Sequence, residues 1–216
     1  MKYVNILSLL TIAGFLLSGC SKPTTEELLL EAKKQLSEGN DNQAVITLKN
    51  AIVEDSRQLE PRLLLAKIYL SNGDGLSAVK ELKQAVKLGA KETIIAGPMV
   101  EALFTAQAFQ SLVDYVDELL PATRESQLDK FRFYQAFSYL ELGKLEAARR
   151  LIERAPSGLD SEYTMATEYI LALVTDDRNT LSKLGERIVG VESVFADALW
   201  LVGKVSYLQE NYPLAV

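Results

Sequence analysis

A sixteen-residue segment occurs twice in this chain, and the second copy lies 34 residues after the first. The copies cover residues 37–52 and 71–86, and seven of their sixteen columns are identical. Part of the pattern returns a third time after Gly143, nearly two periods later. Self-similarity at a period of about 20–50 residues is typical of repeat proteins, in which each unit buries its apolar face against the next. The chain is therefore predicted to stack small, similar units.

The shared columns hold small residues at helical spacing. A glycine is followed five residues later by alanine, four further on by leucine or isoleucine, and three further on by another alanine. An alanine also precedes each glycine by seven residues, and in two copies a tyrosine precedes it by four. The residues predicted to pack at the repeat contacts are Ala32, Gly39, Ala44, Ala51, Ala66, Tyr69, Gly73, Ala78, Ala85, Ala136, Tyr139, Gly143, Ala148 and Ala155.

These columns predict pairs of antiparallel helices in close contact. The first helix of a pair ends near the glycine, which adopts the left-handed conformation readily at a helix C-terminus. In the second helix the two alanines and the aliphatic residue between them lie on one stripe. Small side chains on that stripe let two helix axes approach closely. We therefore expect an all-α chain built from such pairs.

The period, the helix–turn–helix form and the columns resemble the tetratricopeptide repeat (TPR). That resemblance implies a right-handed superhelix, an α-solenoid of antiparallel helix pairs. We expect it over residues 26–216, as about five and a half repeats. The third pair is predicted at 93–107 and 109–120, with Pro98 at the start of its first helix, followed by units at 127–155 and 162–189.

A sixth unit is predicted to begin near residue 192 and to reach Pro213 and Ala215 at the opening of a second helix. Solenoids need a polar cap on the last repeat, and Val216 provides none. We therefore expect either a longer protein, of which this is the N-terminal part, or a partner that covers the open end.

The N-terminus is predicted to be an export signal. Lys2 precedes an apolar segment at residues 6–17, which is too short to span a bilayer, and Leu17-Ser18-Gly19-Cys20 follows. This ending resembles a bacterial lipobox, which implies a lipoprotein signal peptide at 1–19, cleavage before Cys20 and acylation of its thiol (palmitate included) and new amine. Residues 20–25 would form a lipidated tether, and Ser21 resembles the residue that permits sorting to the outer membrane. The alternative is an ordinary signal peptide or start helix that happens to contain cysteine.

Composition excludes several classes of function. The net charge of −6 and the pI of about 4.9 argue against nucleic acid as a partner. The chain has no histidine and one cysteine, so the commonest general base and metal ligand are missing and no intrachain disulfide can form. No catalytic or phosphate-binding motif occurs. We predict no enzyme activity, no metal site and no cofactor.

A narrower resemblance rests on three segments: QAVITLKNA at residues 43–51, EPRLLLAKIYL at 60–70 and KLGA at 87–90. Together with the lipobox they resemble the large TPR-repeat lipoproteins of PEP-CTERM protein-sorting systems, the PrsT type. Pro61 stands where that family usually has alanine, and Ser56 where it usually has proline. The resemblance implies a long, non-enzymatic scaffold that serves exopolysaccharide export and the sorting of proteins with a PEP-CTERM signal.

Candidate binding residues lie on the predicted first helices, which line the concave face of a TPR array. Lys33 and Lys67 share a column and could receive a carboxylate or an acidic extended peptide; the alternative is that they are ordinary solvated lysines. Phe133 and Phe137 share a helix face and are candidates for an aromatic anchor, with packing between units as the alternative.

We expect protein partners, either peptide segments or components of an export machinery, and membrane attachment only through lipid at the periplasmic face. Other roles open to a TPR lipoprotein are outer-membrane protein assembly, pilus biogenesis and recruitment of cell-wall hydrolases. A third possibility, an enzyme with a catalytic domain further downstream, has no support in these residues.

Overall fold

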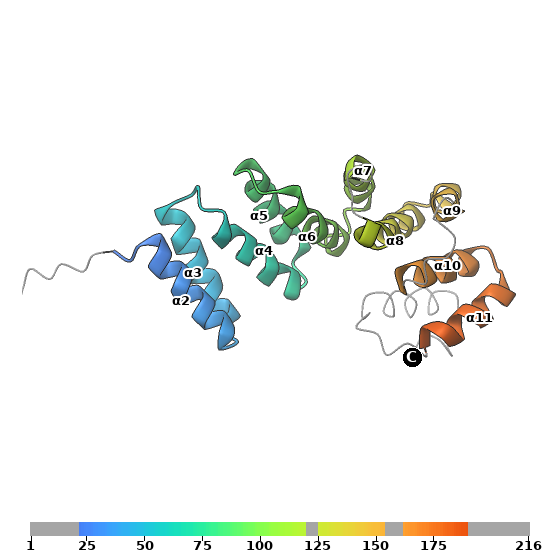
Figure 1. The fold of residues 1–216 in the computed structure, drawn as a ribbon, viewed down its shortest axis with the longest axis horizontal. Coiled ribbons are helices and arrows are strands. Elements are labelled where there is room, and N and C mark those ends of the chain that lie inside the picture. The colour runs from blue at the N-terminus through green and yellow to red at the C-terminus, as the bar shows by residue number, and fades with distance from the viewer. Residues whose placement is uncertain (1–21, 120–124, 154–161, 190–216) are drawn as a thin grey trace, which may run out of the picture. The chain divides into compact units, whose positions relative to one another are not determined.

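The computed structural model describes residues 22–119, 125–153 and 162–189, and within these ranges all regular structure is helical (Figure 1). Contacts divide the chain into two units, Met1–Pro61 and Arg62–Val216. The all-α prediction is confirmed. Each unit is described by itself below.

The first unit contains the helix pair α2 (Thr25–Ser37) and α3 (Asp41–Glu54) (Figure 1). Thr24 starts α2 with a capping box: its hydroxyl accepts the Glu27 N–H at 3.2 Å, and its own N–H donates to the Glu27 carboxylate at 2.8 Å. Gly39 ends the helix at φ +76°, and the Asn40 N–H returns to the Gln35 carbonyl at 2.8 Å. This turn reverses the chain and brings α3 back along α2.

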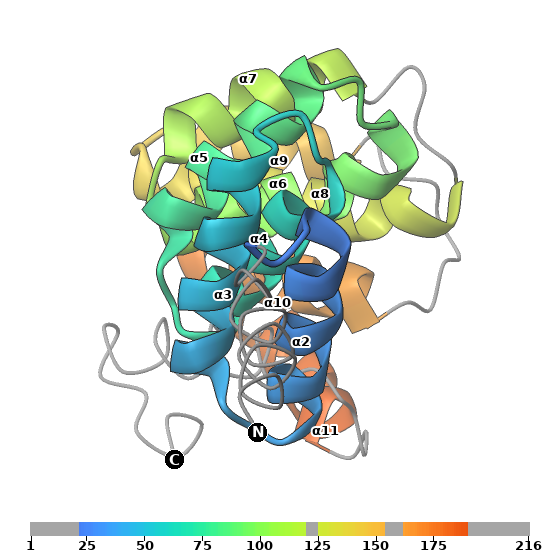
Figure 2. The same ribbon diagram turned by 90° about the vertical axis from the view of Figure 1, so that its left-hand side faces the viewer.

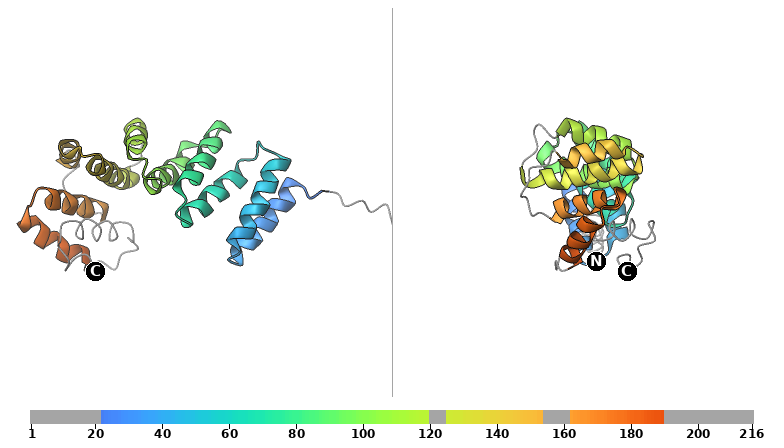
Figure 3. Two further views of the ribbon diagram at one scale, coloured as in Figure 1. Left: turned by 180° about the vertical axis from the view of Figure 1, so that it is seen from behind. Right: turned by 90° about the vertical axis from the view of Figure 1, so that its right-hand side faces the viewer.

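The second unit contains the other helices and most of α4. In chain order they are α4 (Glu60–Ser71), α5 (Gly75–Lys87), α6 (Glu92–Thr105), α7 (Phe109–Leu119), α8 (Glu125–Glu141), α9 (Leu145–Glu153), α10 (Glu162–Val174) and α11 (Arg178–Val189). Figure 2 shows α5, α6 and α7 together, and Figure 3 shows α8 to α11 in yellow and orange. The predicted third pair, at 93–107 and 109–120, corresponds to α6 and α7 within two residues.

One turn geometry ends the first helix of each pair in this unit. After α4 and α8, Gly73 and Gly143 take φ of +73° and +71°. The N–H of the residue that follows each glycine donates to the carbonyl of a tyrosine five residues before it. After α6 and α10 the same geometry is built on Gln107 (φ +55°) and Asp176 (φ +54°). The third and fifth pairs therefore keep the turn of the repeat without its glycine, which explains why their sequences repeat weakly.

Pro98 lies elsewhere than expected. Helix α6 begins at Glu92, so Pro98 is inside the helix and not at its start. The predicted position was wrong. A helix tolerates proline best in its first turn, but α6 already begins at Glu92 and continues through Pro98. The ring removes the N–H that would have bonded to the Ile94 carbonyl. Apolar packing keeps the helix in place, since Ile95, Met99, Val100 and Leu103 are all buried.

Close contacts hold the helices of the second unit together. Gly75, the first residue of α5, lies against the backbone of Ala102 and Ala106 at the end of α6. Arg62 on α4 and Glu81 on α5 form an ion pair at 2.9 Å, with side chains only 14% and 11% exposed. These two contacts position α5 between its neighbours along the chain, and they bring one face of α5 beside α6.

Several predictions fall outside the described residues. They are the signal peptide at 1–19, the lipid attachment at Cys20, the packing role of Ala155, and the sixth unit with Pro213 and Ala215. Within the described residues, no helix combines the length and the apolar character that crossing a membrane requires.

Candidate functional site

The two lysines predicted to bind a partner belong to different units. Lys33 on α2 forms an ion pair with Glu60 at 2.6 Å, and both side chains are about half exposed, at 47% and 52%. Lys67 is exposed on α4. An exposed ion pair stabilises a protein little, because water competes for both charges. Neither lysine lines the hollow described below.

The two predicted aromatic anchors lie in the core, which corrects that hypothesis. Phe133 and Phe137 are 0% and 2% exposed. The Phe137 ring centroid lies 5.3 Å from that of Phe104 on α6 and 6.2 Å from that of Phe109 on α7, both edge to face. Phe133 contacts Tyr163 on α10, at 5.6 Å between centroids. The rings therefore join neighbouring helices and offer no surface to a partner.

The small residues of the repeat columns are buried between helices. Seven alanines at these columns are at most 1% exposed, and Ala136 is 3% exposed. The seven are Ala32, Ala44, Ala51, Ala66, Ala78, Ala85 and Ala148. Tyr69 and Tyr139 are only half-buried. Burial raises the pKa of the Tyr139 phenol, and the carboxylates of Asp117 and Asp114 raise it further.

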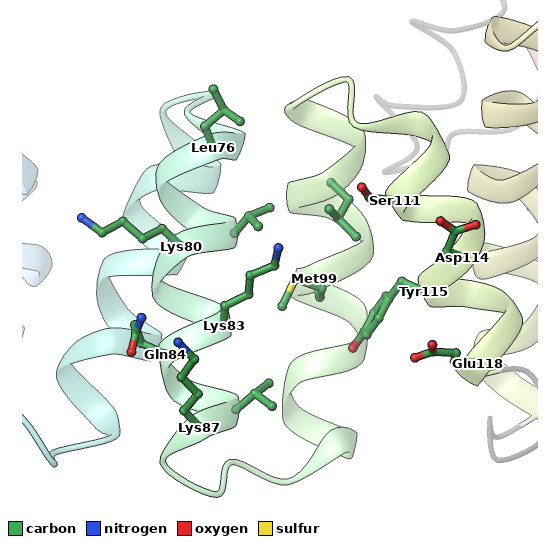
Figure 4. A pocket seen from close by; sticks show the side chains of 13 residues that line it. Leu76, Lys80, Lys83, Gln84, Lys87, Met99, Ser111, Asp114, Tyr115 and Glu118 are labelled. Carbon is green, nitrogen blue, oxygen red and sulfur yellow. The ribbon is translucent and has the colours of Figure 1, made fainter.

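The candidate site is a hollow of about 810 Å³ between α5, α6 and α7 (Figure 4). Helix α6 forms the floor with the buried side chains of Met99 and Leu103. The walls are α5 and α7, which are the second helices of two successive pairs. The hollow is therefore lined mainly by second helices, whereas the sequence led us to expect binding residues on first helices.

The α5 wall is basic. Lys80, Lys83 and Lys87 line it and are exposed, and no ion pair to them exists among the described residues. Their spacing of three and four places them on one side of the helix. Figure 4 shows Lys83 extending beside Met99, while Lys80 points away from the floor. The same wall also carries exposed apolar side chains, with Val86 at 46% and Leu76 at 72% exposure.

The α7 wall is acidic. Asp114 and Glu118 are exposed on successive turns, and Tyr115 lies between them (Figure 4). The Tyr115 hydroxyl donates a 2.6 Å hydrogen bond to Glu92 at the start of α6. Burial raises the pKa of the Tyr115 phenol far above its ordinary value of 10.0, and the Glu92 carboxylate raises it further. Tyr115 therefore stays a neutral donor that ties α7 to α6.

The lining of the hollow suits binding, because it combines an apolar floor with a cationic and an anionic wall. Among the described residues, no group of side chains could hold a metal ion. Sequence reasoning missed the hollow, although one signal was present: lysines at 80, 83 and 87 form a basic stripe along the second helix of the second repeat.

Comparisons with known proteins bear on the fold. No protein-family model and no curated protein sequence matches the chain. Among solved structures, PilF of Pseudomonas aeruginosa is similar at a TM-score of 0.59 and 14% identity, over 88% of this chain and 86% of that one. PilW, described as a widely conserved type IV pilus biogenesis factor, is similar at a TM-score of 0.60 and 14% identity, over 88% of both chains. The chain thus has the tetratricopeptide-repeat fold that these structures share, and identity at this level shows the fold alone.

Proposed function

We propose that the protein is a non-enzymatic scaffold that binds other proteins in the bacterial cell envelope. The observation that carries this proposal is the hollow between α5 and α7, where apolar side chains are exposed beside lysines that form no ion pair within the described part of the chain. Exposed apolar side chains are unfavourable in water, and a patch of them beside polar residues is typical of interaction sites. Stacked helix pairs also present extended surfaces suited to protein partners.

The lipid anchor is part of the proposal and rests on the sequence. Cleavage before Cys20 would leave an acylated cysteine followed by a short polar tether, with the first helix beginning at Thr25. Two or more acyl chains hold a protein stably at a membrane. The protein would then lie at the periplasmic face of the outer membrane, and the solenoid would project from it.

The process that best fits the sequence is PEP-CTERM protein sorting coupled to exopolysaccharide export. Its support is the combination of the lipobox with the segments at residues 43–51 and 60–70. Pilus biogenesis is a second candidate, because the fold resembles that of PilF and of the pilus biogenesis factor PilW. The two candidates share one mechanism, in which the repeats hold partner proteins together at the membrane.

A deletion strain of the source bacterium separates the two processes. We expect loss of the gene to reduce secreted exopolysaccharide and the surface display of PEP-CTERM proteins, while piliation stays unchanged. Loss of surface pili with normal exopolysaccharide would favour the second candidate. Complementation with Cys20→Ser tests the anchor in the same strain: the variant should leave the outer-membrane fraction, and its retention there would contradict lipid anchoring.

A further inference from the structure

We propose that the hollow between α5, α6 and α7 binds an amphipathic helix of a partner protein, and that this helix has an acidic flank facing α5. The inference rests on the proposed scaffold function and specifies the chemistry of its partner.

The basic wall calls for carboxylates. Lys83 and Lys87 lie one helical turn apart, about 6 Å along the axis of α5. Glutamates or aspartates one turn apart on a partner helix have the same spacing, so a helix lying along α5 can pair both lysines at once. Lys80 points away from the floor in Figure 4, and its flexible stem allows it to join as a third cation at the edge.

The acidic wall sets the orientation of the partner. An acidic flank facing Asp114 and Glu118 would place like charges together across the hollow, which costs free energy. The flank facing α7 must therefore be neutral or basic. Tyr115, between these two carboxylates, donates to Glu92 at 2.6 Å and so joins the helix that carries them to α6. The opposite charges of the two walls thus determine which flank of the partner helix is acidic and how that helix is oriented in the hollow.

The apolar surface provides the affinity. Leu76 and Val86 on α5 are exposed, Val79 is partly buried, and Met99 and Leu103 on α6 form a floor that is 4% exposed. A helix that places leucine-sized residues at i, i+3 or i+4 and i+7 would cover the α5 side chains and rest on this floor, as in other helix-in-groove complexes. At about 810 Å³ the hollow is large enough for several side chains but not for a folded domain.

A pair of synthetic peptides tests the proposal on the purified whole chain. Both are ~18-residue helices of about five turns, labelled with a fluorophore, and they have the same leucine face. One carries glutamate along one flank, and the other carries lysine at the same positions. By fluorescence anisotropy we expect the glutamate peptide to bind at least about tenfold more tightly than the lysine peptide. Added salt should weaken it, since the lysines are exposed.

Matched variants locate the site. Lys83→Glu/Lys87→Glu should reduce the affinity for the glutamate peptide by about tenfold or more and increase that for the lysine peptide. Lys22→Glu/Lys34→Glu makes the same change in net charge at exposed positions outside the hollow and should leave both affinities unchanged. Val86→Gln removes apolar surface at a half-exposed position and should weaken both peptides equally. Circular dichroism before each titration identifies any variant that fails to fold.

Several results would overturn the proposal. They are equal affinity for the two peptides, no binding of the glutamate peptide, and binding that Lys83→Glu/Lys87→Glu leaves unchanged. Tight binding of a fatty acid that competes with the glutamate peptide would assign the hollow to a lipid instead. Any of these outcomes would leave the proposed scaffold function standing if the deletion strain and the Cys20→Ser variant behave as expected, because other surfaces of the array could bind the partner.

Discussion

Gly75 and Ala106 lie so close that no side chain fits between them. A Cβ atom on Gly75 would lie 2.3 Å from the Ala106 backbone nitrogen and 2.6 Å from the Ala102 carbonyl oxygen. Both atoms belong to the backbone near the C-terminal end of α6, so they cannot move aside as a flexible side chain would. The first residue of α5 therefore determines how closely α5 approaches α6, and so how one wall of the hollow meets its floor.

The variant Gly75→Ala should destabilise the protein, because α5 and α6 must separate to admit the methyl group. We expect a loss of about 1–3 kcal/mol in the free energy of unfolding, measured by urea denaturation. Gly97→Ala is the matched control: Gly97 lies inside α6, and a Cβ there would meet nothing within 4 Å. It should change the free energy of unfolding by less than about 1 kcal/mol, because the gain in helix propensity is offset by the crowding between a Cβ at this position and the ring of Pro98. Equal effects of the two variants would contradict the close contact.

Gln107 holds a strained backbone conformation in a turn, and replacing it with glycine is predicted to stabilise the protein. Its φ of +55° lies in the left-handed region, where a side chain costs about 1–2 kcal/mol. Gln107 is exposed, so Gln107→Gly removes little packing. We expect the variant to raise the urea midpoint. The reverse change at the equivalent position of another pair, Gly143→Gln, should lower it. A fall in the midpoint for Gln107→Gly would show that its side chain makes a contact that outweighs the backbone strain.

Phe137 should matter for stability and not for binding. Its ring is 2% exposed and packs against Phe104 and Phe109, so Phe137→Ala leaves a cavity between three helices. We expect a loss of about 3–5 kcal/mol in the free energy of unfolding. Phe137→Leu, which keeps most of the volume, should lose less and should bind the glutamate peptide with unchanged affinity. An unchanged stability together with weaker peptide binding would restore Phe137 as an anchor.

Asp74 makes the stability depend on acidic pH. Its carboxylate accepts the Ser77 N–H at 3.0 Å at the start of α5, and hydrogen bonds from Ser77 lower its pKa below the ordinary 3.8. A lowered folded-state pKa favours the folded state above the unfolded pKa, and this contribution is lost as the pH falls through the folded value. Asn caps a helix about as well as Asp but does not titrate.

The comparison of the wild type with Asp74→Asn isolates this carboxylate. We expect the difference in unfolding free energy between the two proteins to be constant from neutral pH to about 5, and the wild type to lose stability relative to Asp74→Asn below about 4. Thermal or urea unfolding at a series of pH values measures it. A difference that stays constant down to about pH 2 would show that the Asp74 carboxylate has the same pKa in both states.

The sequence predicted the helix pairs well because the repeat acts locally. A glycine at the turn determines where a helix ends, and alanines on one stripe determine which helix faces meet. Gly39, Ala44 and Gly73 indicate both features from the sequence alone. Gln107 and Asp176 adopt the same turn without its usual residue, so no local pattern indicates their conformation. Pro98 shows the converse, since tertiary packing overrides a strong local preference.

The hollow could not be predicted from the sequence because its lining residues come together only through the packing of three helices. Lys83 and Asp114 face one space only after α6 has placed α5 and α7 on either side of it. The burial of Glu81 depends in the same way on Arg62, 19 residues away. The aromatic residues show the limit of helix-face reasoning: Phe133 and Phe137 do share a face, yet that face meets other helices and not solvent.

Photocrosslinking in the source bacterium tests most directly whether the protein works by holding a partner in this hollow. A photoreactive phenylalanine analogue replaces Leu76 or Val86 in the hollow, or Leu30 or Val53, which are 71% and 80% exposed on the first unit. We predict a covalent product with one envelope protein from the two hollow positions, and its loss when Lys83→Glu/Lys87→Glu is added. Equal products from all four positions, or none from Leu76 and Val86, would contradict it.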